Sequence, residues 1–239
     1  MNLLFYEASE ATLRGTVTAI ILIALCFTFT RCGMKDTNEE TLEPENIPLS
    51  SDMPDINDTR PILVAFGNSL TEGSGVDPAQ NYPAKLQARI DAAGYSYRVL
   101  NAGEAGETSA QGLNRIESIL DLHPAIVIVE FGANDGLRGI PSGTTRRNLE
   151  EIVARLQSAG AAVVLAGMEM PPNYGPQYTS AFRDIFRRVS EEQGVPLIPF
   201  FLEGVGGHAE LNQTDGIHPT AEGYDIVVDS VWKILQPLL

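Results

Sequence analysis

The sequence predicts an α/β domain in which helices cover both faces of a mostly parallel sheet, and two observations favour this fold class. Beyond residue 60, short apolar runs alternate with longer segments in which apolar residues recur at a helical period. Such alternation is typical of parallel strands joined by right-handed helical crossovers. The chain also has 239 residues, of which 44% are hydrophobic and 20% charged, and this suits one globular core.

Five apolar runs that end near Gly, Pro or Asn are the predicted strands, at residues 62–66, 97–101, 125–131, 162–167 and 196–198. Five segments between and after them are the predicted helices, at residues 81–93, 109–120, 144–159, 177–193 and 220–238. In the first helix, Leu86, Ile90 and Ala93 recur at spacings of four and three. This spacing predicts one buried helix face, which would cover the sheet.

The first 60 residues are expected to lie outside this domain. Residues 16–30 form an uncharged apolar run that Arg14 precedes, with the length found in secretory signal peptides. As a helix this run would span about 22 Å, short of the roughly 30 Å hydrocarbon core of a bilayer, so a signal peptide over residues 1–32 is favoured. Residues 33–60 are rich in Glu, Asp, Asn, Pro and Ser, which predicts a disordered acidic linker before a domain at 61–239.

Cys32 and Gly33, directly after the apolar run, resemble the end of a bacterial lipoprotein signal, in which the cysteine is lipidated. Arg31 stands where such signals have a small residue, and an ordinary cleaved signal is the alternative; both stay open. Either signal predicts export in a bacterium, with the protein periplasmic or attached to a membrane through a lipid on Cys32. The other cysteine of the chain is Cys26, and both lie outside the predicted domain, so the exported domain would fold without disulfides.

Charge and motif content argue against several other classes of protein. The formal net charge is −15 and no basic stripe interrupts it, so nucleic acid is not expected as a partner. The loop at 67–75 lacks both Gly-Lys-Ser/Thr and Gly-x-Gly-x-x-Gly, so a flavodoxin-like nucleotide binder is weakly supported. The histidines are few, and no His-Glu-x-x-His or paired-cysteine spacing occurs, so neither a metal nor a cofactor is predicted.

Ser69 is the candidate nucleophile, because Gly67-Asn68-Ser69-Leu70 forms a predicted sharp turn directly after the first strand. A serine hydroxyl needs a base that takes its proton and an acid that orients the base. Among the three histidines, His218 is the one with an acid at a suggestive spacing: Asp215 lies three residues earlier. One turn can close this separation so that the carboxylate reaches Nδ1 and Nε2 faces Ser69. The alternative is that Asp215 and Pro219 only form a turn and a helix start, with Pro219 at the first helical position.

Three groups that follow predicted strands are candidate donors to the oxyanion of a tetrahedral intermediate. They are the backbone N–H of Ser69, Gly106 and the side-chain amide of Asn134. Because ligands of parallel sheets bind outside the carboxyl ends of the strands, these groups are expected at one edge. Taken singly, Gly106 is better explained as a turn glycine, and an Asx turn is the alternative for Asn134.

Four blocks resemble, in order and in spacing, the GDSL or SGNH hydrolase family: residues 67–70, Gly106, residues 132–135 and residues 215–218. The likeness covers nearly all of residues 61–239. Within the family, the sequence most resembles the bacterial periplasmic branch that combines thioesterase, arylesterase and lysophospholipase activities. It implies a flavodoxin-like three-layer α/β/α sandwich with a five-stranded parallel sheet. It also implies that Ser69, Asp215 and His218 are catalytic and that Ser69, Gly106 and Asn134 form the oxyanion hole.

Asn68 departs from the family pattern, which has Asp at this position. Because both residues cap helices well, activity is expected to survive the difference. The hypothesis is that Asn68→Asp changes turnover modestly, by well under a thousandfold.

The predicted function is hydrolysis of carboxylic esters, and by extension thioesters, of small to medium acyl chains through an acyl-enzyme on Ser69. Lysophospholipase or carbohydrate-ester deacetylase activity at the same site is one alternative, and a non-catalytic binding module on the same fold is another. The segment after the fourth strand supplies a candidate substrate pocket made by Met170, Pro172, Asn173 and Tyr174. Its methionines would equally serve as core residues, and Trp232 is expected in the core.

Overall fold

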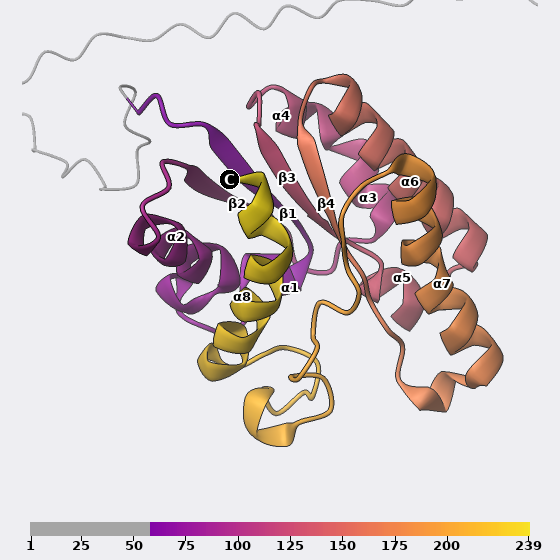
Figure 1. Ribbon diagram of the computed structural model, residues 1–239. Coiled ribbons are helices and arrows are strands. Elements are labelled where there is room, and N and C mark those ends of the chain that lie inside the picture. The colour runs from indigo at the N-terminus through magenta and orange to yellow at the C-terminus, as the bar shows by residue number, and fades with distance from the viewer. Residues whose placement is uncertain (1–57) are drawn as a thin grey trace, which may run out of the picture. The chain divides into compact units, whose positions relative to one another are not determined.

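The computed structural model describes residues 58–239 (Figure 1). The predicted signal peptide, the lipidation candidate Cys32 and the predicted linker up to residue 57 lie outside the described residues. The last residues of that linker, 58–60, are described. Directly before the first strand, the side chain of Arg60 pairs with that of Asp58 at 2.8 Å. No helix in this described part of the chain combines the length and the hydropathy that a bilayer crossing requires.

A five-stranded parallel sheet forms the middle layer, as the sequence predicted, with the strand order β2-β1-β3-β4-β5. The strands are β1 Ile62–Gly67, β2 Arg98–Gly103, β3 Ile126–Glu130, β4 Ala162–Ala166 and β5 Leu197–Ile198. After β2 the chain crosses back past β1 to form β3, so the direction of winding reverses between β1 and β3. Ligands of open α/β sheets bind outside the carboxyl ends of the strands at such a reversal.

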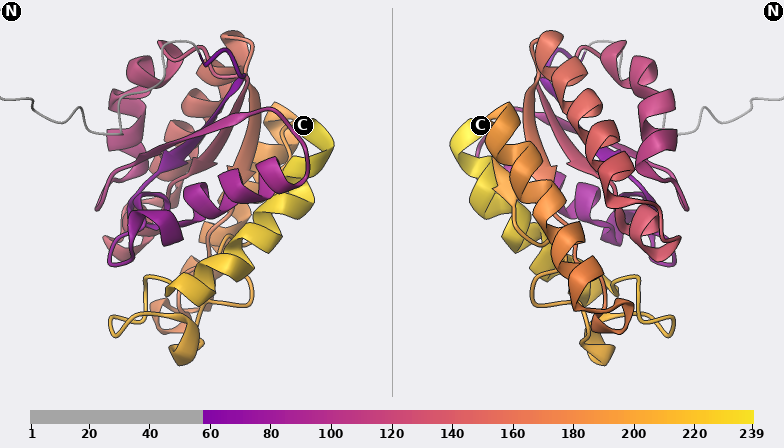
Figure 2. Two further views of the ribbon diagram at one scale, coloured as in Figure 1. Left: turned by 90° about the vertical axis from the view of Figure 1, so that its left-hand side faces the viewer. Right: turned by 90° about the vertical axis from the view of Figure 1, so that its right-hand side faces the viewer.

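Helices cover both faces of this sheet (Figures 1 and 2), which confirms the predicted three-layer sandwich. The long helices α2 and α8 lie on one face, and α6 and α7 lie with α3 on the other. The helices are α1 Ser69–Glu72, α2 Tyr82–Ala92, α3 Ser109–Asn114, α4 Ile116–Leu120, α5 Ala133–Leu137, α6 Ser142–Ser158, α7 Pro176–Gln193 and α8 Ala221–Leu235. Short 3₁₀ turns lie at Pro78–Gln80, Pro172–Tyr174, Ala209–Leu211 and Gln236–Leu238.

The core lies between the sheet and each helical layer. All five residues of β3 are buried, as expected for a central parallel strand that is covered on both faces. Leu86 and Ile90 of α2 are fully buried, as predicted, and Trp232 of α8 is a core residue. The prediction for Ala93 is wrong: α2 ends at Ala92, so Ala93 caps its C-terminus and is exposed.

Three local predictions need correction. The helix expected over 109–120 is interrupted at Arg115, whose φ of −105° and ψ of 14° separate α3 from α4. The last helix begins at Ala221, with Thr220 as its N-cap, because the threonine hydroxyl accepts from the N–H of Gly223 at 3.2 Å. Pro219 therefore lies before the cap. The short helices α1 and α5 were missed, since four or five residues carry too little periodicity to recognise.

Candidate active site

The turn after β1 places Ser69 at the start of α1. Asn68 is the N-cap of this helix, and its side-chain oxygen accepts from the N–H of Leu70 at 3.0 Å. Gly67 has no space for a side chain, because a Cβ there would lie 2.1 Å from Thr71 Oγ1 and 2.7 Å from the carbonyl oxygen of Glu130. A glycine is thus required where the strand meets the helix, and the turn lifts Ser69 out of the buried strand.

The structure brings Ser69, His218 and Asp215 together in one chain of hydrogen bonds. The Nε2 atom of His218 lies 2.9 Å from Ser69 Oγ, and its Nδ1 atom lies 2.6 Å from Asp215 Oδ2. The other carboxylate oxygen of Asp215 accepts from the backbone N–H groups of Ile217 at 2.9 Å and His218 at 3.1 Å. The spacing of three residues therefore closes as a single turn, as the sequence suggested.

The electrostatics of this turn determine which imidazole nitrogen carries the proton. The hydrogen bond from His218, together with the N–H groups of Ile217 and His218, lowers the pKa of Asp215 to about 2. Asp215 is therefore ionised at neutral pH and can only accept hydrogen bonds. Nδ1 of His218 must then be the donor, which leaves Nε2 as the acceptor for the Ser69 hydroxyl.

The candidate oxyanion donors follow three adjacent strands. Ser69, Gly106 and Asn134 come after β1, β2 and β3, and the sheet order places β1 between the other two. Gly106 has a φ of +78°, a left-handed conformation that favours glycine, and its carbonyl accepts from Arg138 at 2.7 Å. Asn134 Nδ2 donates to the carbonyl of Glu107 at 2.9 Å. An amide group has two N–H donors, so the second remains for a substrate oxygen.

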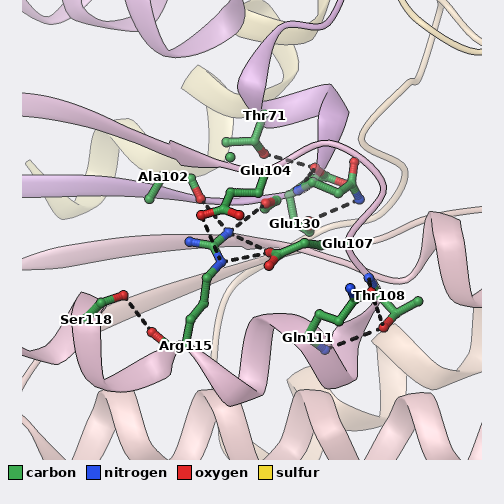
Figure 3. Close-up of polar contacts among 12 residues, drawn as sticks. Thr71, Ala102, Glu104, Glu107, Thr108, Gln111, Arg115, Ser118 and Glu130 are labelled. Atoms are coloured by element: carbon green, nitrogen blue, oxygen red, sulfur yellow. Dashed lines mark hydrogen bonds and ion pairs between the residues drawn. The ribbon is translucent and has the colours of Figure 1, made fainter. Parts of the chain in front are cut away.

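A buried polar cluster under this turn consists of Asn68, Thr71 and Glu130 and was missed in the sequence. Figure 3 shows Thr71 and Glu130 of this cluster. The fully buried Glu130 carboxylate accepts from Asn68 Nδ2 at 3.0 Å, from the N–H of Asn68 at 3.3 Å and from Thr71 Oγ1 at 2.9 Å. Burial raises the pKa of Glu130 to about 8, although these three donors act to lower it. A glutamate inside an otherwise apolar run was the one signal in the sequence.

A second buried carboxylate, Asp135, joins the segments that carry Gly106 and Asn134. It accepts from the backbone N–H of Ser109 at 2.8 Å, from Ser109 Oγ at 2.5 Å and from Thr145 Oγ1 at 3.1 Å. Ser109 begins α3 and Asp135 lies in α5, so these bonds connect the two helices that follow the candidate oxyanion donors Gly106 and Asn134.

A cavity of about 440 Å³ adjoins the candidate catalytic side chains. Leu70 and Ile217, the sequence neighbours of Ser69 and His218, line it together with Met170 and Pro172. Asn173 and Tyr174 are not among its lining residues. The Tyr174 ring is exposed, and its hydroxyl donates to the carbonyl of Leu137 at 3.4 Å.

The sequence left open whether the methionines of this segment line a pocket or pack in the core, and they do both. Met168 and Met170 are buried core residues, and both also line the cavity. Within residues 58–239, no group of three or more His, Cys, Asp or Glu side chains is placed to hold a metal ion.

Comparison with known proteins places this arrangement in a family. Residues 65–226 match the model of the GDSL-like Lipase/Acylhydrolase family. The esterase TesA of Pseudomonas aeruginosa is 42% identical over 178 residues, which are 74% of this chain and 89% of TesA. Thioesterase 1/protease 1/lysophospholipase L1 of Escherichia coli is 37% identical over 74% of this chain and 84% of its own length. The arylesterase of Vibrio mimicus is 36% identical over 71% of this chain and 85% of its own length.

Solved structures agree with these relatives. A crystal structure of TesA matches with a TM-score of 0.73 at 42% identity, and the match covers 74% of this chain and 99% of that one. The psychrotrophic esterase EstA from Pseudoalteromonas, in a structure inhibited by monoethylphosphonate, matches with a TM-score of 0.70 at 32% identity. That match covers 74% of this chain and 97% of EstA.

Proposed function

The chain belongs to the GDSL-like lipase/acylhydrolase family and is an SGNH-type ester hydrolase, and from this premise we propose that Ser69, His218 and Asp215 are its catalytic triad. The observation that carries the proposal is the continuous chain of contacts from Ser69 Oγ through His218 to Asp215, at 2.9 and 2.6 Å. A nucleophile, a base and an orienting acid in hydrogen-bond contact are the arrangement that covalent acyl transfer needs.

The reaction proceeds in two halves. Ser69 Oγ attacks the ester carbonyl carbon while His218 Nε2 takes its proton, and the ionised Asp215 stabilises the imidazolium that forms. His218 then returns the proton to the leaving alcohol, which departs and leaves an acyl group on Ser69. A water molecule, deprotonated by the same histidine, hydrolyses this acyl-enzyme and restores the free serine.

The oxyanion of each tetrahedral intermediate is held by the backbone N–H groups of Ser69 and Gly106 and by the side-chain amide of Asn134. These donors act on charge that develops only in the transition state, so they accelerate the chemical step. Removal of one such donor typically lowers the rate by about 100- to 1000-fold.

The cavity favours small to medium acyl chains without a negative charge. Its volume of about 440 Å³ lies within the usual range for small-molecule sites. Among the described residues that line it, Glu169 is the one charged residue, and most of the others are apolar. In the described part of the chain, no cationic side chain lines the cavity to bind an anionic substrate, so uncharged esters are preferred and thioesters with an anionic leaving group are poorer substrates.

A panel of p-nitrophenyl esters of rising chain length tests this proposal on the wild type, Ser69→Ala and the control Ser74→Ala. Ser74 follows α1 and is partly exposed, with a hydroxyl that donates to Glu72, so its removal should leave the rates unchanged. Ser69→Ala should lose about a millionfold in kcat. Wild-type rates in Ser69→Ala would overturn the assignment of the nucleophile, and a rate that ignores chain length would overturn the assignment of the cavity.

We also propose that the protein is exported in a bacterium, with residues 1–32 as its signal. The support is the uncharged apolar run at residues 16–30, of a length typical of secretory signals. Mass spectrometry of the mature protein distinguishes the two forms of export. A diacylated Cys32 at the N-terminus indicates a membrane-anchored lipoprotein, an unmodified N-terminus elsewhere indicates ordinary cleavage, and retention of Met1 overturns both.

A further inference from the structure

The catalytic assignment does not explain why the helix is interrupted at Arg115, between α3 and α4. From its contacts we infer that Arg115 is a positioning residue that fixes the geometry of the oxyanion hole. It acts through the oxyanion loop, defined here as residues 104–108, on Asn134. The inference rests on the proposed function, because it assumes that Gly106 and Asn134 donate to the substrate oxyanion.

Arg115 connects three segments that meet at the carboxyl edge of the sheet (Figure 3). Its Nη2 atom donates to the carbonyl of Gly67 at 3.1 Å and to the carbonyl of Ala102 at 2.8 Å. Its Nε atom donates to the carboxylate of Glu107 at 2.8 Å, and Nη2 lies 2.7 Å from the same carboxylate. Among the residues that the structure describes, no other side chain donates to both the turn that holds Ser69 and the oxyanion loop.

The surroundings of Arg115 hold it in place. Its side chain is 19% exposed, and that of Glu107 is 11% exposed. The guanidinium lies over the ring of Phe66, 4.7 Å from the ring centroid, which adds a cation–π contact to the hydrogen bonds. The planar guanidinium offers several donors in fixed directions, so it can bind two carbonyls and a carboxylate at once, whereas an ammonium group lacks this fork.

Glu107 connects Arg115 to Asn134. The side chain of Glu107 is held by Arg115, while its backbone carbonyl accepts from Asn134 Nδ2 at 2.9 Å. That bond fixes the direction of one amide N–H and therefore also the direction of the second N–H, which we assign to the oxyanion. The interruption of the helix at Arg115 is the backbone conformation from which its side chain makes these contacts.

Loss of this connection should affect the transition state more than substrate binding. An error of about 1 Å in the position of a catalytic group can cost about 100-fold in rate. Because the oxyanion donors act on charge that is absent from the ground state, kcat should fall while KM stays nearly constant. Arg115→Gln should therefore lower kcat by about 10- to 100-fold.

The test is a double-mutant cycle between Arg115→Gln and Asn134→Ala, with kcat and KM measured on p-nitrophenyl butyrate. If Arg115 acts through Asn134, Arg115→Gln should lower kcat by less than about threefold once Asn134 is alanine. Arg115→Lys should recover only part of the loss, because lysine keeps the charge and lacks the fork. Arg155→Gln is the matched control, since Arg155 pairs with Glu117 on the surface, and its kcat should equal that of the wild type.

Several outcomes decide the inference. Equal fold-losses from Arg115→Gln in both backgrounds, or a rise in KM at constant kcat, would overturn it. If Arg115→Gln does not fold, Glu107→Gln replaces it in the cycle, and the same non-additivity with Asn134→Ala is required. Ser69→Ala is assayed beside these variants: full activity there would remove the proposed function itself, whereas an inactive Ser69→Ala with an additive cycle would remove only the role of Arg115.

Discussion

The Asp215–His218 turn and the buried cluster of Asn68, Thr71 and Glu130 flank the same serine but are built in opposite ways. Asp215 has a side chain that is 44% exposed, and it meets its partner three residues away. Glu130 is fully buried, and its partners lie 59 and 62 residues away. The first carboxylate has a lowered pKa and the second a raised one. We expect that the exposed turn governs the rate and that the buried cluster governs stability and its dependence on pH.

Asp215→Asn should show the largest effect and separate the two regions most clearly. Asparagine cannot stabilise the imidazolium and also permits the wrong tautomer of His218, so kcat should fall by about 1000- to 10,000-fold. Because the side chain is largely exposed, the melting temperature should change by at most about 2 °C. Steady-state kinetics and thermal unfolding measure both quantities. The control Asp225→Asn removes an exposed partner of Lys85 and should alter neither. A loss in kcat below about tenfold would contradict the assignment of Asp215.

Glu130→Gln should instead change how stability depends on pH. The pKa of Glu130 is about 8 in the folded protein, against an ordinary value of 4.5. Between these values the unfolded chain releases a proton that the folded protein keeps, so this residue makes the protein less stable as the pH rises. Each unit of the pKa difference corresponds to about 1.4 kcal/mol. Glutamine does not ionise, so the variant should gain stability relative to the wild type as the pH rises.

Urea unfolding at about pH 5 and about pH 8 measures this effect as the difference between the two proteins, so that other ionisable groups cancel. Glu191→Gln is the control, because Glu191 is an exposed partner of Arg187. Parallel pH profiles for the wild type and Glu130→Gln would show that Glu130 does not bind a proton in this range.

The same contrast explains which features the sequence could predict. The apolar runs of the strands and the three-residue spacing of Asp215 and His218 are local patterns, so the sheet was predicted within one or two residues per end, and the turn formed as expected. The contacts of Glu130, and the contact of Arg115 with Gly67, join residues 48 to 62 positions apart, and no local pattern encodes them. The interruption at Arg115 was missed for this reason, since the helical periodicity continues through it.

Asn68→Asp should have the smallest effect on turnover. It changes a residue that belongs to the buried cluster and directly precedes Ser69, so it tests whether the cluster also affects the rate. Aspartate can keep the cap on Leu70, but it replaces the amide that donates to Glu130 at 3.0 Å with a second carboxylate. Two carboxyl groups this close share a proton, so the pair stays singly ionised at about neutral pH and loses this proton only at high pH. Turnover at about pH 6 should change by less than about tenfold, and stability should fall more steeply than in the wild type above about pH 8. Kinetics and urea unfolding across this range measure both effects. A thousandfold change in turnover would mean that position 68 acts directly on the reacting groups, in which case the buried cluster would share the control of rate with the Asp215–His218 turn.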